Sequence, residues 1–109
     1  MIPLRTQEEF EALYRPALPN KAPILIYFTA NWCGACKRLD WAFLTQEFPN
    51  LTIYKCDVDE NKYTPGFCGV RSIPAFTMVH TNGTTQGPFV SSDTAKVASW
   101  IFTQIKGKA

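Results

Sequence analysis

Hydrophobic runs along the chain predict three strands of a central sheet. Residues 24–28 are continuously apolar, β-branched or aromatic, which is typical of a strand buried on both faces of a sheet. Residues 51–58 alternate between two faces, with Cys56 on one and Lys55 on the other, and residues 75–79 form a third apolar run. A helical pattern separates the first two strands, so we expect a βαβ crossover with parallel pairing.

Turn residues after the third run predict a hairpin. Asn82–Gly83 is a strong signal for a two-residue turn. Its second strand is expected at residues 84–86, with Gly87–Pro88 ending the pairing. His80, beside the turn, is interpreted as a solvated surface residue.

Apolar residues at helical spacing predict one helix before the first strand and one after it. Thr6 and Glu9 match a capping box for the first helix, which we expect to end near Tyr14, before two prolines. The second helix is expected to begin at residues 33–36 and to close at Pro49–Asn50. Its predicted apolar stripe comprises Ala35, Leu39, Ala42, Phe43 and Gln46.

Two further helices complete the pattern. A short helix is expected over residues 59–68, interrupted at Pro65–Gly66, and Ser92 or Asp93 can cap the last helix. The stripe of the last helix comprises Val97, Trp100, Ile101, Gln104 and Ile105. The elements in order predict an α/β fold, a mixed sheet with helices on both faces, in a single domain spanning residues 1–109.

Composition and charge narrow the class of protein. A chain of 109 residues with 46% hydrophobic residues is ordinary for one globular domain. The net charge of +2 is too mild to indicate a nucleic acid or membrane partner, and no apolar run approaches the roughly 20 residues of a membrane span. The first residues lack the pattern of a signal peptide, so we expect a cytoplasmic, reducing location and a monomer. Four basic side chains could bias the choice of partner but are expected on solvated faces: Lys37, Arg38, Lys55 and Arg71.

Cys33 and Cys36 are the candidate chemistry of the chain. They stand three positions apart at a predicted helix start, about one turn of roughly 3.6 residues from each other. Unpaired N–H groups and the positive end of a helix dipole favour a thiolate at Cys33, and the thiolate is the nucleophile in disulfide exchange. Cys36 is then close enough to attack a mixed disulfide at Cys33. We interpret the pair as a dithiol/disulfide centre.

A structural zinc half-site is the alternative for this pair. Structural zinc usually takes four ligands, commonly as two spaced pairs, but eleven residues separate Cys56 from Cys68 and His80 is remote in sequence. We therefore expect redox chemistry and no metal. Cys56 is interpreted as a packed small hydrophobic residue, and Cys68 as inert, with a regulatory or dimer-forming thiol as its alternative.

The motifs together resemble the thioredoxin family. The matching segments are residues 23–37 (PILIYFTANWCGACK), Lys55, residues 57–59, residues 70–74 (VRSIP) and Asn82–Gly83. Their order and spacing match the family from about Ile24 to the last helix. The resemblance implies a thioredoxin fold.

The same resemblance implies a reductase of protein disulfides. Cys33 and Cys36 would cycle between a dithiol and a redox-active disulfide without a bound cofactor, and NADPH and FAD would act only through a thioredoxin reductase partner. The bond before Pro74 is expected to be cis and to lie beside the dithiol, so that the backbone of Ile73 pairs with a segment of a disulfide-containing protein. The rim of this substrate-binding surface would comprise Trp32, Gly34 and Ala35.

Two departures from the family leave alternatives open. Tyr27 stands where thioredoxins commonly carry a buried Asp that helps to deprotonate the second thiol, and tyrosine, with a reference pKa near 10, is a poor base. Ala35 stands where the commonest motif has Pro, and residues between the cysteines help to set the redox potential. An oxidase, isomerase or glutaredoxin-like role is one alternative to a reductase. A binding or accessory subunit is the alternative from another class.

Overall fold

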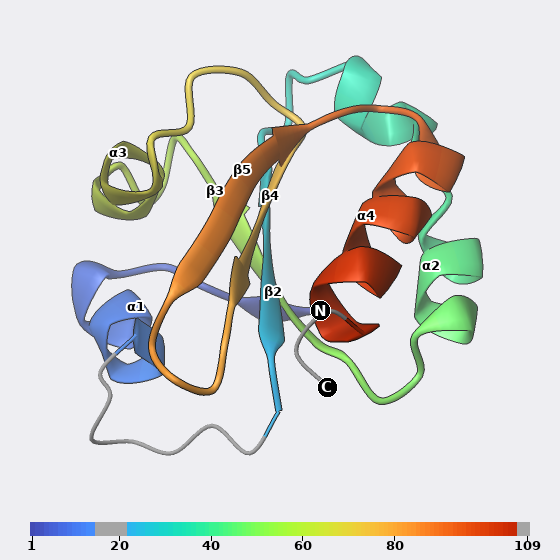
Figure 1. Cartoon of the computed structure of the whole chain (residues 1–109). Helices are drawn as coiled ribbons and strands as arrows, with labels where there is room; N and C mark the ends of the chain where they lie inside the picture. The colour runs from blue at the N-terminus through green and yellow to red at the C-terminus, as the bar shows by residue number, and fades with distance from the viewer. Residues whose placement is uncertain (15–21, 107–109) are drawn as a thin grey trace.

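Within residues 1–14 and 22–106, which the computed structural model describes, five strands form one mixed sheet (Figure 1). The strands are β1 (Ile2–Pro3), β2 (Ile24–Thr29), β3 (Thr52–Asp57), β4 (Ala75–Val79) and β5 (Thr85–Val90). Their spatial order is β1-β3-β2-β4-β5. β3 pairs in parallel with β1 and β2, whereas β4 runs antiparallel to β2 and β5. The mixed sheet predicted from the sequence is confirmed.

Strand β2 lies at the centre of the sheet and leads into the two cysteines. All six of its residues are buried, as the continuous apolar run predicts. Both edges of β2 are paired, so that Ile26 lies opposite Tyr54 of β3 and Thr77 of β4. β2 is therefore held from both sides as far as Phe28, which fixes the point from which the turn with the two cysteines begins.

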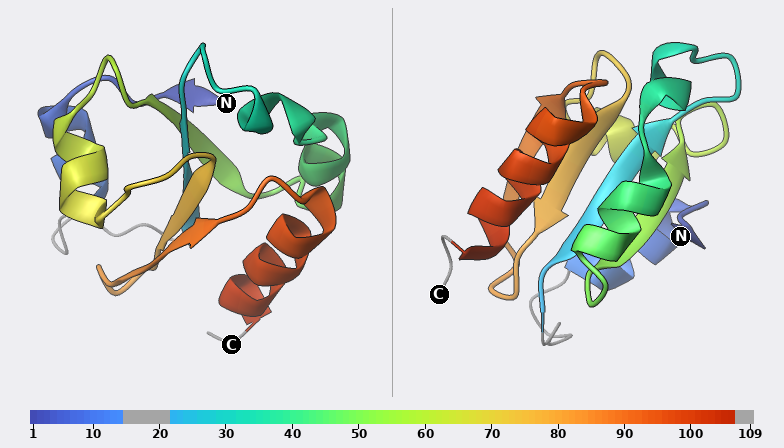
Figure 2. Two further views of the ribbon diagram at one scale, coloured as in Figure 1. Left: turned by 90° about the horizontal axis from the view of Figure 1, so that it is seen from above. Right: turned by 90° about the vertical axis from the view of Figure 1, so that its right-hand side faces the viewer.

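Helices cover both faces of the sheet (Figures 1 and 2). The described helices are α1 (Gln7–Tyr14), the 3₁₀-helix η1 (Ala35–Arg38), α2 (Trp41–Glu47), α3 (Tyr63–Cys68) and α4 (Thr94–Lys106). α1 and α3 lie on one face of the sheet, and α2 and α4 lie on the other. The core under α2 and α4 includes Leu25, Tyr27, Leu44, Phe76, Met78, Val97 and Ile101. The core under α1 and α3 includes Leu4, Phe10, Ile26, Phe28 and Cys56.

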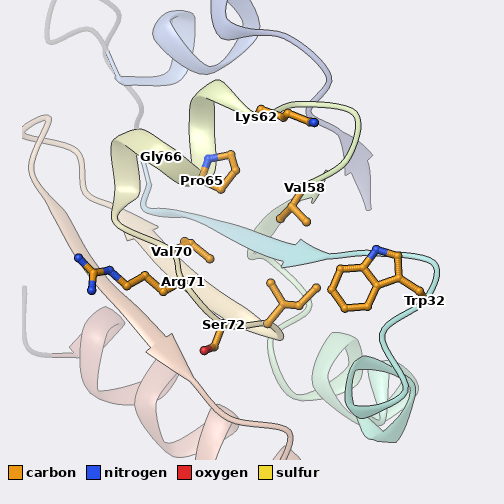
Figure 3. Close-up of a pocket in the computed structure, with 9 residues that line it drawn as sticks. Trp32, Val58, Lys62, Pro65, Gly66, Val70, Arg71 and Ser72 are labelled. Carbon is orange, nitrogen blue, oxygen red and sulfur yellow. The ribbon is translucent and has the colours of Figure 1, made fainter.

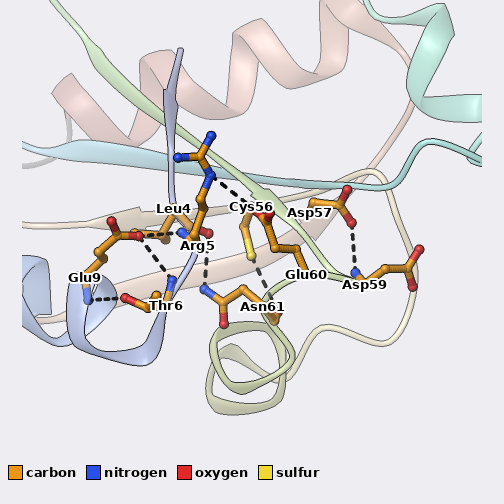
Figure 4. A network of polar contacts seen from close by, with 9 residues as sticks. All are labelled: Leu4, Arg5, Thr6, Glu9, Cys56, Asp57, Asp59, Glu60 and Asn61. Atoms are coloured by element: carbon orange, nitrogen blue, oxygen red, sulfur yellow. Dashed lines mark hydrogen bonds and ion pairs between the residues drawn. The ribbon is translucent and has the colours of Figure 1, made fainter.

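The predicted capping box opens α1. The Glu9 N–H donates to Thr6 Oγ1 at 3.1 Å, and the Thr6 N–H donates to Glu9 Oε1 at 3.1 Å (Figure 4). The Arg5 N–H donates to the same carboxylate oxygen at 2.6 Å. Pro16 and Pro19–Asn20, predicted to end this helix, lie outside the described residues.

The single helix predicted after the cysteines is broken into two. η1 ends at Arg38, and α2 begins only at Trp41. Asp40 caps α2, because its Oδ1 accepts from the Phe43 N–H at 3.0 Å. Its own N–H donates to Thr94 Oγ1, also at 3.0 Å, at the start of α4. The break therefore coincides with a contact between two helices that are far apart in sequence.

This break turns a different face of α2 toward the core. Leu39 is buried as predicted, but Ala42, Phe43 and Gln46 of the predicted stripe are exposed. Leu44 is buried in their place, with Trp41 and Phe48 packed against the same cluster. The predicted stripe was wrong because the new start at Asp40 resets the helical phase.

α3 and α4 are present where the sequence predicts helices, with three corrections. α3 starts at Tyr63 and not at residue 59, Pro65–Gly66 does not interrupt it, and Ile105 of the predicted α4 stripe is exposed. α3 runs through Pro65 because the N–H that Pro65 lacks falls in the unpaired first turn. It ends at Gly69, whose φ of 74° provides a left-handed cap. Of the two residues predicted to cap α4, Asp93 does so, with its Oδ1 accepting from the Ala95 N–H at 3.0 Å.

The hairpin has a three-residue loop where the sequence predicts a two-residue turn. The His80 N–H donates to the Thr84 carbonyl at 2.8 Å, and the Gly83 N–H donates to the His80 carbonyl at 3.0 Å. Gly83 takes a φ of 83°, the left-handed position that such loops require. His80 is buried, 2% exposed, with Nε2 3.3 Å from Gln104 Oε1 of α4. The interpretation of His80 as a solvated residue was wrong, since α4 covers the base of the hairpin.

Strand β5 continues through Gly87–Pro88, where its pairing was predicted to end. Val90 pairs with Ala75 and Phe89 with Phe76, beyond a bulge in the register. β5 is the edge of the sheet, where a proline without an N–H is tolerated. Gly87 has a φ of 124°, and a Cβ there would lie 2.6 Å from the Phe76 carbonyl oxygen, so only glycine fits this position.

Candidate active site

Cys33 and Cys36 form a disulfide where the chain leaves β2 and enters η1. Their Cα atoms are 5.3 Å apart. The Cys33 N–H donates to the Ala30 carbonyl at 3.1 Å, which closes the turn, and the Cys36 N–H donates to Cys33 Sγ at 3.1 Å. The dipole of a long helix, which the sequence predicts here, is replaced by a short 3₁₀-helix and this one backbone donor.

The two sulfurs are shielded while the residues around them are open to solvent. Cys33 is 4% exposed and Cys36 is 5% exposed. Trp32, which precedes them, is 69% exposed, Gly34 is exposed and Ala35 is half-buried. The residues predicted to form the rim therefore surround the disulfide at the surface. An exposed tryptophan is a large apolar contact area that is free for a partner.

Asp59 holds the indole of Trp32. Trp32 Nε1 donates to Asp59 Oδ2 at 2.7 Å across 27 residues of sequence. The Asp59 N–H in turn donates to Asp57 Oδ1 at 2.9 Å, so the loop after β3 is itself ordered by a local bond (Figure 4). Sequence reasoning included residues 57–59 in the matching segments but assigned Asp59 no role. The hydrogen bond to Asp59 restricts the rotation of the exposed indole, so the ring offers a partner a surface of fixed orientation.

A groove of about 530 Å³ extends from Trp32 along α3 and the loop before β4 (Figure 3). Ile73 lines it, and the Ile73–Pro74 peptide bond is cis, as the resemblance implies. The lining residues are Trp32, Val58, Lys62, Pro65, Gly66, Val70, Arg71, Ser72 and Ile73. The structure thus brings Trp32 and Ile73, 41 positions apart in the sequence, to one surface feature.

A second cavity, of about 370 Å³, lies beside Cys36. Tyr27, Thr29 and Lys55 contribute to its wall. The Tyr27 hydroxyl donates to Thr29 Oγ1 at 3.2 Å, and the Tyr27 ring stacks on Phe76 with centroids 5.4 Å apart. Tyr27 is therefore a packed core residue whose single polar atom is bonded to a neighbouring hydroxyl.

A family model described as Thioredoxin matches residues 3–103. The chain belongs to the thioredoxin family. Thioredoxin from Geodia cydonium is 35% identical over 75 residues, which cover 67% of this chain and 69% of that protein. Mitochondrial thioredoxin O1 of Arabidopsis thaliana is 29% identical over 98 residues, covering 86% of this chain but only 50% of that longer protein.

Solved structures agree on the fold. The structure of Fasciola hepatica thioredoxin superimposes with a TM-score of 0.80 at 26% identity, and the match covers 94% of this chain and 97% of that one. The thioredoxin fold expected from the sequence is confirmed. The chain is accordingly a thiol–disulfide oxidoreductase of the thioredoxin family, with a CxxC dithiol and the activity of a protein-disulfide reductase. Thioredoxins use this redox-active disulfide and no bound cofactor.

The other two cysteines are free thiols whose surroundings disfavour the thiolate form. Burial raises the pKa of the Cys56 thiol to about 12, with Cys68 and nearby carboxylates adding to the effect. Burial also raises the pKa of Cys68 to about 11. Cys56 is fully buried in the core under α1 and α3, so its interpretation as a packed small residue is confirmed.

Residues 1–14 and 22–106 hold no group of three or more His, Cys, Asp or Glu side chains that could bind a metal ion. Over the same ranges, each helix is too short or too polar to cross a membrane.

Proposed function

We propose that Cys33 is the attacking thiol and Cys36 the resolving thiol in the reduction of protein disulfides. The thiolate of Cys33 attacks one sulfur of a substrate disulfide, forms a mixed disulfide and expels the other substrate sulfur as a thiolate, which takes up a proton. Cys36 then attacks Cys33 Sγ and expels the second substrate sulfur. Two electrons pass to the substrate, and the Cys33–Cys36 disulfide remains.

The hydrogen bond at the active-site turn supports this assignment of roles. The Cys36 N–H points at Cys33 Sγ from 3.1 Å, and a donor in this position stabilises negative charge on the sulfur that it faces. Cys33 also follows directly after the exposed Trp32, which contributes to the groove. The single observation that carries the proposal is the Cys33–Cys36 disulfide beside this groove.

The substrate segment is proposed to bind between the rim and the Ile73–Pro74 loop. Trp32, Gly34 and Ala35 offer apolar and small surfaces beside the sulfurs. Ile73 lies outside the strands, and none of the backbone bonds recorded among the described residues involves its N–H or C=O. An extended segment can pair with this backbone, a mode of recognition that tolerates many side chains.

The resolving step proceeds without a carboxylate base in this chain. Tyr27 occupies the place of the usual Asp, and its hydroxyl is bonded to Thr29 Oγ1. Lys55, on the wall of the same cavity, is a proton donor when charged. We propose that the proton of Cys36 passes to water or to the departing substrate thiolate.

Electrons for the next cycle would come from a thioredoxin reductase that uses FAD and NADPH, as the family relationship suggests. The protein is proposed to act as a monomer on disulfide-containing proteins, with no nucleic acid or membrane partner. A reducing compartment, predicted as the cytoplasm, suits this direction of electron flow.

Insulin reduction by dithiothreitol tests the proposal. The wild-type protein is expected to accelerate the reaction, Cys33→Ser to abolish the acceleration, and Cys36→Ser to remove most of it. Undiminished acceleration by Cys33→Ser would overturn the proposed roles, and a Cys33→Ser/Cys36→Ser chain with full biological effect would indicate a binding subunit.

A further inference from the structure

We propose that the groove beside the dithiol selects extended protein segments that carry acidic side chains two or three residues from the reactive cysteine. This inference rests on the proposed function and adds a substrate preference to it. The cationic side chains that would recognise the carboxylates are Lys62 and Arg71.

The charged side chains among the described residues that line the groove are all positive. Among the described residues that line it, Lys62 and Arg71 are the ionisable ones, and none is a carboxylate. The remaining lining residues are apolar or small, apart from Ser72. Figure 3 shows Lys62 and Arg71 at different margins, with Pro65 and Val70 between them. A segment lying across the apolar floor would therefore meet a cation at either margin.

Neither cation forms an ion pair with a residue that the structure describes. Both side chains are exposed, and the ion pair recorded among the described residues involves neither of them. That pair joins Arg5 Nε to Glu60 Oε1 at 3.8 Å, so the nearest carboxylate before Lys62 in sequence already has a cationic partner. Asp59, the other acidic neighbour, accepts from the Trp32 indole.

The place of Arg71 fixes where the acidic side chain should stand. Arg71 precedes Ile73 by two residues in the loop that lines the groove, and an extended substrate segment would advance about 3.3 Å per residue along it. A segment that places its cysteine at Cys33 and pairs with Ile73 runs past Arg71 at its second or third residue. The sequence analysis expected Arg71 on a solvated face, and its side chain is exposed. Because the guanidinium group is exposed, a partner can reach its charge.

The preference is measured with three disulfide-bonded peptides. They differ only at the second and third positions on each side of the reactive cysteine, which are Asp, Asn or Lys. The reduced protein is mixed with each peptide, quenched with acid and alkylated, and the oxidised fraction from mass spectrometry gives a second-order rate constant. Ionic strengths of about 0.01 M and about 1 M are compared, since the Debye length falls from about 30 Å to about 3 Å.

At the lower ionic strength the Asp peptide is expected to react about three- to tenfold faster than the Lys peptide, since exposed pairs contribute modestly. This ratio is expected to approach one at the higher ionic strength. Lys62→Glu/Arg71→Glu should invert it, and Lys62→Gln/Arg71→Gln should bring it near one. The control is Lys106→Glu, which makes the charge change of one of these two Glu substitutions at the far end of α4 and should leave the ratio unchanged (Figure 1).

The outcomes separate this inference from the proposed function. If the wild-type protein fails to reduce the uncharged Asn peptide, the proposed function is wrong. If it reduces all three peptides at one rate, the function stands and the acidic preference is overturned. An Asp preference that persists in Lys62→Glu/Arg71→Glu would overturn the assignment to these two residues. Glutathione disulfide, an anionic disulfide too short to pair along Ile73, should react more slowly than the Asp peptide, and equal rates would contradict recognition of an extended segment.

Discussion

Trp32 and Asp59 are joined by a 2.7 Å hydrogen bond that fixes an exposed indole beside the disulfide. Asp59→Ala removes the acceptor and should lower kcat/KM for insulin reduction about three- to tenfold. This change corresponds to a loss of about 0.7–1.4 kcal/mol in transition-state stabilisation. Both residues are exposed, so the free energy of unfolding should change by less than about 1 kcal/mol. Asp59→Asn, which keeps an acceptor oxygen, is the matched control. An Asp59→Ala protein with unchanged kcat/KM would show that the indole needs no anchor.

Tyr27 is expected to act as a packing residue and not as a base. Tyr27→Phe keeps the ring stacked on Phe76 and removes the hydrogen bond to Thr29, at a cost of about 1 kcal/mol in denaturant unfolding. The pH profile of the resolving step should stay that of the wild type. Tyr27→Ala also removes the ring and should cost about 3–5 kcal/mol. A pH profile altered by Tyr27→Phe would contradict the proposed route of the Cys36 proton.

Gly87 is the glycine whose replacement should cost most. In Gly87→Ala the new Cβ would lie 2.6 Å from the Phe76 carbonyl oxygen, in a backbone conformation with φ of 124°. The free energy of unfolding should fall by about 2 kcal/mol or more. Gly66→Ala is the control, because Gly66 lies in α3 with nothing within 4 Å of its Cβ position, and this change should be neutral or slightly stabilising. Equal losses in the two variants would refute the account of the bulge.

Alkaline pH should destabilise the oxidised protein through Cys56 and Cys68. Their folded pKa values, about 12 and about 11, lie above the 9.0 of an unperturbed thiol. The two thiols therefore ionise at a lower pH in the unfolded chain than in the folded chain. Their contribution to the free energy of unfolding is complete below pH 9 and falls as the pH rises toward 12. The slope should be on the order of 1 kcal/mol per pH unit for each thiol.

Cys56→Ala and Cys68→Ala isolate this effect in denaturant unfolding followed between pH 8 and about 11. Each variant starts less stable than the wild type at pH 8 because it loses packing. The difference from the wild type should narrow as the pH rises, since the variant no longer exposes a thiol that ionises on unfolding. A difference that stays constant with pH would contradict the raised pKa values.

Local patterns predicted the elements that position the site. The apolar run of β2, the two cysteines after it and the Thr6–Glu9 capping box are each legible in a few neighbouring residues, and each is present in the structure. The cis bond before Pro74 was predicted through the resemblance to thioredoxins and is also present. The strand, the cysteine pair and the capping box depend on short-range chemistry that a single sequence carries, whereas the prediction of the cis bond depended on the family resemblance.

Features of the structure that depend on tertiary contacts could not be predicted from the local sequence patterns. The helix after the cysteines breaks because Asp40 caps α2 and bonds to Thr94, 54 residues away. His80 is buried because α4 packs over the hairpin base and presents Gln104. Asp59 anchors Trp32 from a loop on another part of the chain. Each is a long-range relationship, which periodicity along the sequence does not contain.

The assignment of Cys33 as the attacking thiol is tested most directly by trapping the mixed disulfide. Cys36→Ser, reduced and mixed with insulin, should accumulate a covalent adduct, because the resolving thiol is absent. Peptide mapping should find the substrate sulfur bonded to Cys33, and Cys33→Ser should give no adduct under the same conditions. An adduct through Cys56 or Cys68, or one formed through Cys36 in Cys33→Ser, would contradict the account.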